Sequence, residues 1–412
     1  MLEHDDPEVA DVIAKEKVRV ADTLDLIAAE SHAPLSVLEA AGSIFSTKAA
    51  EGYPGRRFHA GCRYADELET LAMTRAKRLF GAEHVNVQPH SGSSANLAVY
   101  FALLELGDPI LAMRLSHGGH LTHGAAASMT RRCFEFAHYG VHPETERIDY
   151  DEVRRLALDF RPKLIVAGAS SYARLIDYET MARIAREISA HLLVDMSHIA
   201  GLVAAKVIPT PIPHSDFVTF TTYKTLMGGR GGVIICKQDF ARRVDQAIFP
   251  GGQGTPALNE VAAKATCFGL ASTPRFADLQ KKIIDNAKVF AQALTQLGYR
   301  VVTGGTDNHL VLIDLRPKGL QGKGAETALE SAGIIANRNV IPGDPQSADI
   351  ASGIRIASTA ITARGMGPAE VTQIAEWMDR AMGAGRKKHV LRDVAQAVKR
   401  LCRRYPVPER II

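Results

Sequence analysis

Short apolar runs that do not alternate with polar residues are the feature that most constrains the fold. They occur at residues 85–87, 110–112, 164–166, 192–194, 217–218 and 233–235, and the segments between several of them have helical spacing. A strand that is apolar on both faces has to be covered on both faces, as in parallel sheets flanked by helices. The sequence therefore predicts an α/β protein with a large, mostly parallel sheet.

A second set of runs indicates a smaller domain. After about residue 280 the apolar runs are 301–302, 310–313 and 353–357, interleaved with helical segments, while residues 7–30 have the spacing of an amphipathic helix. A chain of 412 residues is long enough for one large core and a smaller one. We predict an N-terminal helical arm at residues 1–45, a large domain at 46–280 and a small α/β domain at 281–412.

Composition and charge exclude several classes of protein. The formal charge of +4 is too small to indicate a nucleic-acid partner, and the apolar runs are too short to span a bilayer. The five cysteines are scattered without a CxxC pair, and the acidic N-terminus lacks a signal-peptide core. We expect a cytoplasmic protein without a disulfide framework.

Lys224 is the candidate nucleophile. It stands among hydroxyl residues between the run at 217–218 and the run at 233–235, with glycines and Arg230 following. This pattern predicts strand, tight loop and strand, with the lysine held in the loop. A lysine fixed in this way can form an imine with a carbonyl compound. The alternative is an ordinary surface lysine beside a glycine turn.

Three further segments carry candidate ligand groups. Ser91, Gly92 and Ser93 follow a strand and open an apolar helix, where free backbone N–H groups suit a phosphate; a plain N-cap is the alternative. Asp195 ends a buried strand, at the edge that faces the ligand in open α/β sheets; a structural aspartate is the alternative. The loop 115–124 holds three histidines, but its glycines favour a flat ligand over a metal, and no carboxylate or cysteine in the loop completes a ligand set.

Taken together, these segments supply the groups that pyridoxal phosphate requires. They offer a phosphate anchor, a ring stack, an acid for the ring nitrogen and a lysine, and Arg355 adds a clamp for a substrate carboxylate. Each segment is weak by itself, and the combination carries the inference.

From about residue 16 to residue 406 the chain resembles the serine hydroxymethyltransferases. The resemblance rests on long motifs in the same order, at residues 50–55 (AEGYPG), 86–93 (NVQPHSGS), 117–124 (HGGHLTHG), 194–196 (VDM), 223–225 (YKT), 249–254 (FPGGQG), 304–309 (GGTDNH) and 352–355 (SGIR). It implies the type I pyridoxal-phosphate fold with a seven-stranded sheet, working as a homodimer, or a tetramer, with active sites shared between subunits.

The resemblance also implies a role for individual residues. Lys224 binds the cofactor, Asp195 pairs with its ring nitrogen, and His120 stacks on the ring. Glu51 and Gly254 reach in from the partner subunit, Glu51 as the acid that handles protons near the substrate hydroxyl and the folate. The remaining implied contacts are to the phosphate (Ser91, Gly92, Ser93), to the phenolic oxygen or substrate (Ser170, His198), to the substrate carboxylate (Arg355) and to tetrahydrofolate (Leu115, Leu121, Asn339).

Several positions depart from the family pattern, and the resemblance places them near the substrate. Ala29 replaces a serine, Ala49 a tyrosine, Tyr223 a histidine and Thr255 a glycine, and Phe58-His59 replace a tyrosine pair. We include Ala29, Ala49, His59 and Arg230 among the substrate-binding residues and Tyr223 among the cofactor-binding ones. Ala29 and Ala49 remove bulk near the substrate Cα, and admitting one methyl group changes binding by only ~1–3 kcal/mol. The donor is therefore serine or α-methylserine, with glycine or D-alanine as product.

Three alternatives remain at this point. The first is a folate-independent aldolase or threonine-type transaldolase on the same fold. The second is a catalytically silent binding protein, against which the retention of Lys224 and Asp195 argues. The third concerns the basic C-terminal stretch 386–404, which is typical of a solvated helix face but would also suit a polyanion such as RNA or a polyglutamate tail.

Overall fold

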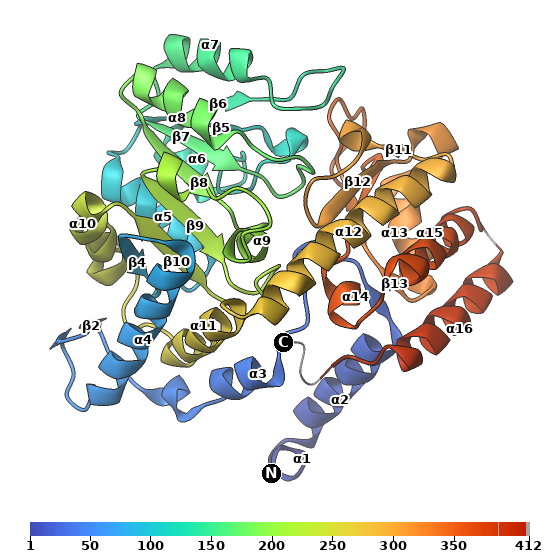
Figure 1. Ribbon diagram of the computed structural model, residues 1–412, viewed down its shortest axis with the longest axis horizontal. Coiled ribbons are helices and arrows are strands. Elements are labelled where there is room, and N and C mark those ends of the chain that lie inside the picture. Colours follow the sequence, from blue (N-terminus) through green and yellow to red (C-terminus); the bar gives the residue numbers. More distant parts are fainter. Residues whose placement is uncertain (386, 409–412) are drawn as a thin grey trace. The chain divides into compact units, whose positions relative to one another are not determined.

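The computed structural model describes residues 1–385 and 387–408 (Figure 1). These residues form two compact units, a large one made of residues 33–281 and a small one that combines residues 1–32 with the chain from residue 282 onward. Arg386, the first residue of the basic C-terminal stretch, lies outside the described residues.

The large unit is built on a seven-stranded sheet with the order β4-β10-β9-β8-β7-β5-β6. Strand β10 runs antiparallel to both of its neighbours, and every other adjacent pair is parallel. This confirms the predicted mostly parallel sheet. The strands are β4 (His84–Asn86), β5 (Pro109–Met113), β6 (Glu135–Tyr139), β7 (Leu164–Gly168), β8 (His191–Asp195), β9 (Phe217–Thr221) and β10 (Gly232–Cys236), and a separate hairpin pairs β2 (Gly52–Tyr53) with β3 (Arg56–Arg57).

Strand β6 is the member of the sheet that the apolar runs did not reveal. Its sequence, Glu-Phe-Ala-His-Tyr, mixes polar and apolar residues, and it lies at an edge of the sheet with only β5 as neighbour. An edge strand is covered less completely than a central one, so it tolerates polar side chains that break an apolar run.

Helices cover both faces of this sheet. On one face α5 and α10 pack through Tyr100 and Val244 onto side chains such as Phe217; on the other face Phe80 of α4 contacts Phe220, with ring centroids 4.9 Å apart. The alternation of Phe217 and Phe220 between faces follows from the two-residue period of a strand. The helices of this unit are α3 (Leu35–Ala41), α4 (Arg63–Phe80), α5 (Gly92–Leu103), α6 (Met129–Cys133), α7 (Tyr150–Phe160), α8 (Tyr178–Glu187), α9 (Ala200–Ala204), α10 (Ala241–Gln246) and α11 (Leu258–Ala271).

The small unit contains an antiparallel sheet with the order β11-β12-β15-β14 and a short parallel pair, β1 with β13. The boundary between the units falls within α12 (Pro274–Gln296). Its other elements are β1 (Leu24–Asp25), β11 (Arg300–Val301), β12 (Leu310–Asp314), β13 (Ile334–Ile335), β14 (Asn337–Asn339), β15 (Gly353–Ala357), α1 (Leu2–Asp5), α2 (Pro7–Asp22), α13 (Gly322–Ser331), α14 (Thr359–Ala363), α15 (Pro368–Met382) and α16 (Lys388–Arg404).

The N-terminal helix is shorter than its spacing indicated. The prediction of a helix over residues 7–30 is wrong beyond Asp22, where α2 ends and the chain becomes extended. Leu24 and Leu26 are buried while Asp25 between them is less so, and that two-residue period belongs to a strand. The pairing of Leu24 with Ile334 draws this segment into the small unit.

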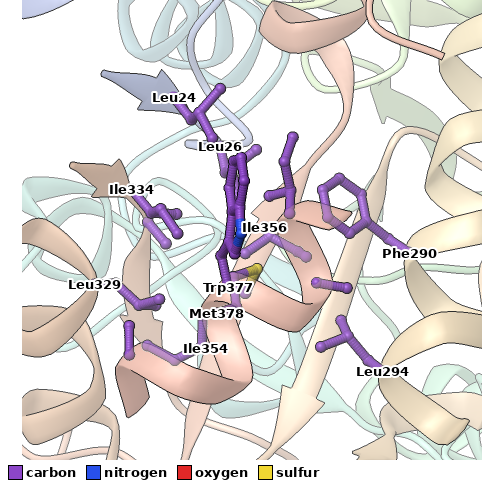
Figure 2. Packing of buried hydrophobic residues seen from close by; sticks show 14 of the residues in the cluster. Leu24, Leu26, Phe290, Leu294, Leu329, Ile334, Ile354, Ile356, Trp377 and Met378 are labelled. Carbon is purple, nitrogen blue, oxygen red and sulfur yellow. The ribbon is translucent and has the colours of Figure 1, made fainter. Parts of the chain in front are cut away.

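The core of the small unit forms where this N-terminal strand meets the C-terminal elements. Leu24 and Leu26 lie in one buried cluster with Phe290 of α12, Ile356 of β15 and Trp377 of α15 (Figure 2). Residues more than 350 positions apart therefore share a single core, and burial of these large side chains stabilises the unit by roughly 1.5–3 kcal/mol each.

Among the described residues, no helix combines the length and the apolar character that crossing a membrane requires.

Candidate active site

Asp195 is the last residue of β8, and its carboxylate is fully engaged. Oδ1 accepts hydrogen bonds from the Ser197 N–H at 3.0 Å and the Ser197 hydroxyl at 2.6 Å. Oδ2 accepts a hydrogen bond from the side-chain amide of Asn96 at 2.9 Å, and His123 Nε2 lies 3.4 Å from it. The predicted strand-end position is confirmed, and these contacts fix the direction of the carboxylate.

The protonation states around Asp195 follow from the hydrogen bonds. His123 Nδ1 accepts the N–H of His120 at 3.2 Å, so a neutral His123 carries its proton on Nε2, which faces Asp195. Burial by itself would raise the pKa of Asp195, but His123, His120 and the Ser197 hydroxyl outweigh it and hold the pKa below its ordinary value. The site therefore presents an ionised carboxylate at neutral pH.

His120 is neutral at the same site. Burial is the main cause that lowers the pKa of His120 to about 4, and the positive charges of His123 and Lys224 act in the same direction while Asp195 opposes them. Thr122 fixes the ring, since its N–H donates to His120 Nδ1 at 3.2 Å and its hydroxyl lies 2.7 Å from the same atom. An uncharged imidazole held in this way suits stacking on a flat aromatic ligand.

The three groups also lie close enough to hold a metal ion. Ligand atoms of His120, His123 and Asp195 all fall within 4.8 Å of one another. The sequence argument that no carboxylate joins these histidines is therefore wrong, because the fold brings Asp195 beside them. The Nδ1 atoms of both histidines and both oxygens of Asp195 already accept hydrogen bonds, an arrangement that serves a polar network rather than an empty ligand set.

Lys224 follows β9, the strand next to β8 in the sheet, so it lies at the same sheet edge as Asp195. It is buried, and its loop is pinned from several sides. The Thr222 hydroxyl donates to Gly229 O at 2.6 Å, and the Thr225 hydroxyl donates to His198 O at 2.9 Å and accepts the Gly201 N–H. The expectation of a lysine held in a tight turn between two strands is confirmed.

The start of α5 forms the predicted phosphate cup. Ser91 is the N-cap; its hydroxyl accepts the Ser94 N–H at 3.1 Å, and its own N–H donates to the Ser94 hydroxyl at 2.9 Å. Gly92 is buried against β9, since a Cβ there would stand 2.8 Å from Thr221 Cγ2. Ser93 is exposed, and the remaining N–H groups of the first turn have no partner within the helix.

Lys264 supports this cup from below, and sequence reasoning missed it. Its side chain is only 1% exposed, and Nζ donates to the carbonyls of Val87, Pro89 and Gly232 at 2.7–3.0 Å. A single ammonium group thereby ties the chain before Ser91 to the start of β10. A lysine in an apolar helical run (residues 258–271) is the only signal in the sequence that could have indicated it.

Glu51 and Gly254 lie together within one chain. A Cβ on Gly254 would stand 3.3 Å from Glu51 Oε1, so the carboxylate rests against the glycine main chain. The two residues to which the resemblance assigns a role in the partner's active site therefore form one surface.

Other candidates of the large unit surround these loops. The Arg230 guanidinium lies 4.5 Å above the Tyr223 ring, and the Ser170 N–H donates to Gly118 O at 2.6 Å, which joins the loop after β7 to the histidine loop. His198 is buried directly after the Asp195 turn. Leu115 and Leu121 are about half exposed on the histidine loop, while Ala49, His59 and Phe58 are exposed on the Glu51 segment.

The small unit holds the remaining candidates, Arg355, Asn339 and Ala29. Arg355 lies on β15, where Nε and Nη2 both donate to Asn337 Oδ1 at 3.2 Å. Burial lowers the pKa of Arg355 to about 10, so the guanidinium stays charged at neutral pH. Asn339 lies on the neighbouring strand β14 and donates to Val340 O, and Ala29 is half-buried after β1. Asn337 was not foreseen, because its register opposite Arg355 appears only in the folded sheet.

Comparison with known proteins agrees with this geometry. The family model described as serine hydroxymethyltransferase matches residues 2–378. The chain is 50% identical over 408 residues to proteins named serine hydroxymethyltransferase from three strains of Dehalococcoides mccartyi (195, CBDB1 and BAV1), and each match covers 99% of this chain and 98% of the relative.

Proposed function

The chain belongs to the serine hydroxymethyltransferase family, and from this premise we propose that it transfers a one-carbon unit between a β-hydroxy amino acid and tetrahydrofolate with pyridoxal phosphate as cofactor. The observation that carries the proposal is the pairing of a buried, ionised Asp195 with a buried Lys224 at the ends of adjacent strands, next to the open start of α5.

The groups on the protein fit the cofactor. When bound, pyridoxal phosphate supplies an electron sink that stabilises negative charge developing on the substrate Cα. Asp195 would keep the ring nitrogen protonated, neutral His120 would lie against the ring, and the N–H groups after Ser91 would hold the phosphate. Asn96, Ser197 and His123 keep Asp195 in the orientation and charge state that this contact requires.

Two further residues handle the substrate. Arg355 would bind the α-carboxylate, for which a planar guanidinium offers two parallel hydrogen bonds. Glu51 would receive and return the proton of the β-hydroxyl group in the partner's active site, so the proposed enzyme is a homodimer. Half-exposed Leu115 and Leu121, together with Asn339, would contact tetrahydrofolate.

The test is turnover of serine by a Lys224→Ala variant. We expect loss of the visible absorption band that the holoenzyme shows and loss of cleavage of serine in the presence of tetrahydrofolate, with the melting temperature of the apoprotein unchanged. Lys237→Ala is the matched control, because Lys237 pairs with Asp216 on the surface and should keep full activity. Full turnover by Lys224→Ala would contradict the mechanism.

The donor is a finer question that the small residues bear on. We propose that Ala29 and Ala49 admit an α-methyl group, so that α-methylserine competes with serine as donor and D-alanine with glycine as product. Ala49→Tyr should lower kcat/KM for α-methylserine relative to serine by about tenfold or more, the effect of excluding one methyl group. An unchanged ratio would show that residue 49 does not set the preference.

The transaldolase alternative changes the acceptor and keeps the cleavage. It is favoured by the absence of tyrosine at positions 49 and 59. The same assay separates the two functions: the hydroxymethyltransferase releases little glycine from serine without tetrahydrofolate, whereas undiminished cleavage without folate supports the aldolase or transaldolase.

A further inference from the structure

One buried guanidinium holds the main chain on both sides of Glu51. The side chain of Arg57 is 3% exposed, and Nη1 donates to Ala50 O at 2.9 Å and to Gly52 O at 2.8 Å. These carbonyls belong to the residues immediately before and after Glu51. The carbonyl of Glu51 itself accepts the Phe58 N–H at 3.0 Å. Three consecutive carbonyls are thus fixed, and the side chain of Glu51 projects from a segment with little freedom.

The guanidinium is itself anchored by α4. Nε donates to Asp66 Oδ1 at 2.8 Å, and Nη2 donates to Glu69 Oε2 at 2.6 Å. The side chain of Glu69 is 1% exposed, and burial raises the pKa of Glu69 while the charge of Arg57 opposes the shift. An eighteen-residue helix therefore transmits its position to the Glu51 segment through one arginine.

Gln88 closes the network into a ring. Its amide donates to Glu69 Oε1 at 2.8 Å and to Gly52 O at 2.9 Å, so Gly52 O accepts hydrogen bonds from both Arg57 and Gln88. Gly52 has φ +94°, and a Cβ there would stand 2.3 Å from Arg56 O, so the turn after Glu51 admits no side chain. Gln88 precedes the phosphate cup, which couples the Glu51 segment to the sheet.

We infer that Arg57 is a positioning residue for Glu51: through the carbonyls of Ala50 and Gly52 it sets where the carboxylate stands for proton transfer. The inference rests on the proposed function, in which Glu51 handles the proton of the substrate hydroxyl. Arginine is required because its planar fork reaches two carbonyls and two carboxylates at once, which the three donors of a lysine cannot do. A displacement of about 1 Å at a reacting group lowers a rate by roughly 10²-fold.

The decisive experiment is a double-mutant cycle on the holoenzyme between Arg57→Lys and Glu51→Gln. We expect Arg57→Lys to lower kcat for serine cleavage by about 10²-fold, with the KM for serine and the cofactor absorption band unchanged. In the Glu51→Gln background the same substitution should lower kcat no further, because the group that it positions is already gone. Multiplying effects, or a loss of cofactor binding with intact kcat, would overturn the inference.

Two more variants keep the test independent of stability. Asp66→Asn weakens the hold on Arg57 without leaving a buried charge, and it should lower kcat less than Arg57→Lys and only when Glu51 is present. Arg75→Lys is the matched control: Arg75 is also an arginine of α4 that donates to a main-chain carbonyl, that of Ala265, far from Glu51 in the sequence, and should keep kcat. Unchanged kcat in both Arg57→Lys and Asp66→Asn would also overturn the inference.

Failure of this inference is distinguishable from failure of the proposed function. If Glu51→Gln alone keeps full turnover, the proton-handling role of Glu51 is wrong whatever Arg57 does. If Glu51→Gln is slow and Arg57→Lys is not, the function stands and the positioning role is wrong.

Discussion

The side-chain amide of Asn96, fully buried in the first half of α5, donates a hydrogen bond to Asp195 Oδ2 at 2.9 Å. The same amide nitrogen donates to the Thr122 hydroxyl, and Asn96 Oδ1 accepts the Thr219 hydroxyl. One residue therefore joins the helix of the phosphate cup, the histidine loop, β9 and the strand-end carboxylate. Asn96 sets the geometry of the site without being exposed to a ligand.

Asn96→Ala should lower the affinity for pyridoxal phosphate more than it lowers stability in general. Loss of the amide leaves Asp195 and two buried hydroxyls each without a partner, at about 1–3 kcal/mol for each group. Asn286→Ala is the control, since Asn286 is equally buried in the small unit and donates to Thr362 and Met366 O. Cofactor titration and melting curves on both variants check this, and equal affinities would contradict the role of Asn96.

Gly92→Ala should disturb the phosphate cup, and Thr221→Ser should repair it. A Cβ on Gly92 would stand 2.8 Å from Thr221 Cγ2, and forcing an extra methyl group into a packed site costs about 1–3 kcal/mol. Thr221→Ser removes that methyl group and keeps the hydroxyl. We expect weaker cofactor binding in Gly92→Ala and recovery in the double variant, measured by cofactor titration. No recovery would mean that the clash lies elsewhere.

Lys264→Met should destabilise the protein by about 3 kcal/mol or more, because three buried carbonyls lose their donor at about 1–3 kcal/mol each. Pro89 O and Gly232 O border the phosphate cup, so cofactor affinity should fall as well. Urea unfolding and cofactor titration measure the two effects. Lys237→Met, on the surface, should change neither, and wild-type behaviour of Lys264→Met would refute the supporting role.

Asp25→Asn should gain stability relative to the wild type as the pH rises. Burial, followed by the charge of Glu30, raises the pKa of Asp25 to about 8 from 3.8. The folded state thus favours the protonated form, whose contribution is complete below pH 3.8 and is lost as the pH rises through about 8. One such proton corresponds to a slope of about 1.4 kcal/mol per pH unit.

Asparagine at position 25 can still accept the Ile27 N–H, which Asp25 Oδ1 accepts at 2.9 Å, and it does not ionise. The free energy of unfolding in urea, measured at pH 5 and pH 8, should diverge between the wild type and Asp25→Asn. Asp11→Asn, on the exposed face of α2, should follow the wild type. Parallel pH profiles for all three proteins would show that Asp25 is ionised in the fold at both pH values.

The sequence by itself determined the sheet and the ends of its strands. Doubly apolar runs at positions such as 164–166 and 192–194 can be buried on both faces in only one kind of architecture, and in that architecture Asp195 and Lys224 fall at the edge where ligands bind. The start of α5 at Ser91 followed from local capping chemistry. These features depend on residues close in sequence, and for that reason they can be inferred from it.

The tertiary structure alone decided which side chains stand behind those ends. Asn96 and Asp195, 99 residues apart, meet because α5 packs on the sheet, and Arg57 meets Glu69 and Gln88 because a hairpin packs on α4 and β4. No local pattern distinguishes such an asparagine or arginine from a solvated one. A polar side chain acquires its partner only when burial removes water and leaves another buried group to satisfy it, and which group that is depends on the whole fold.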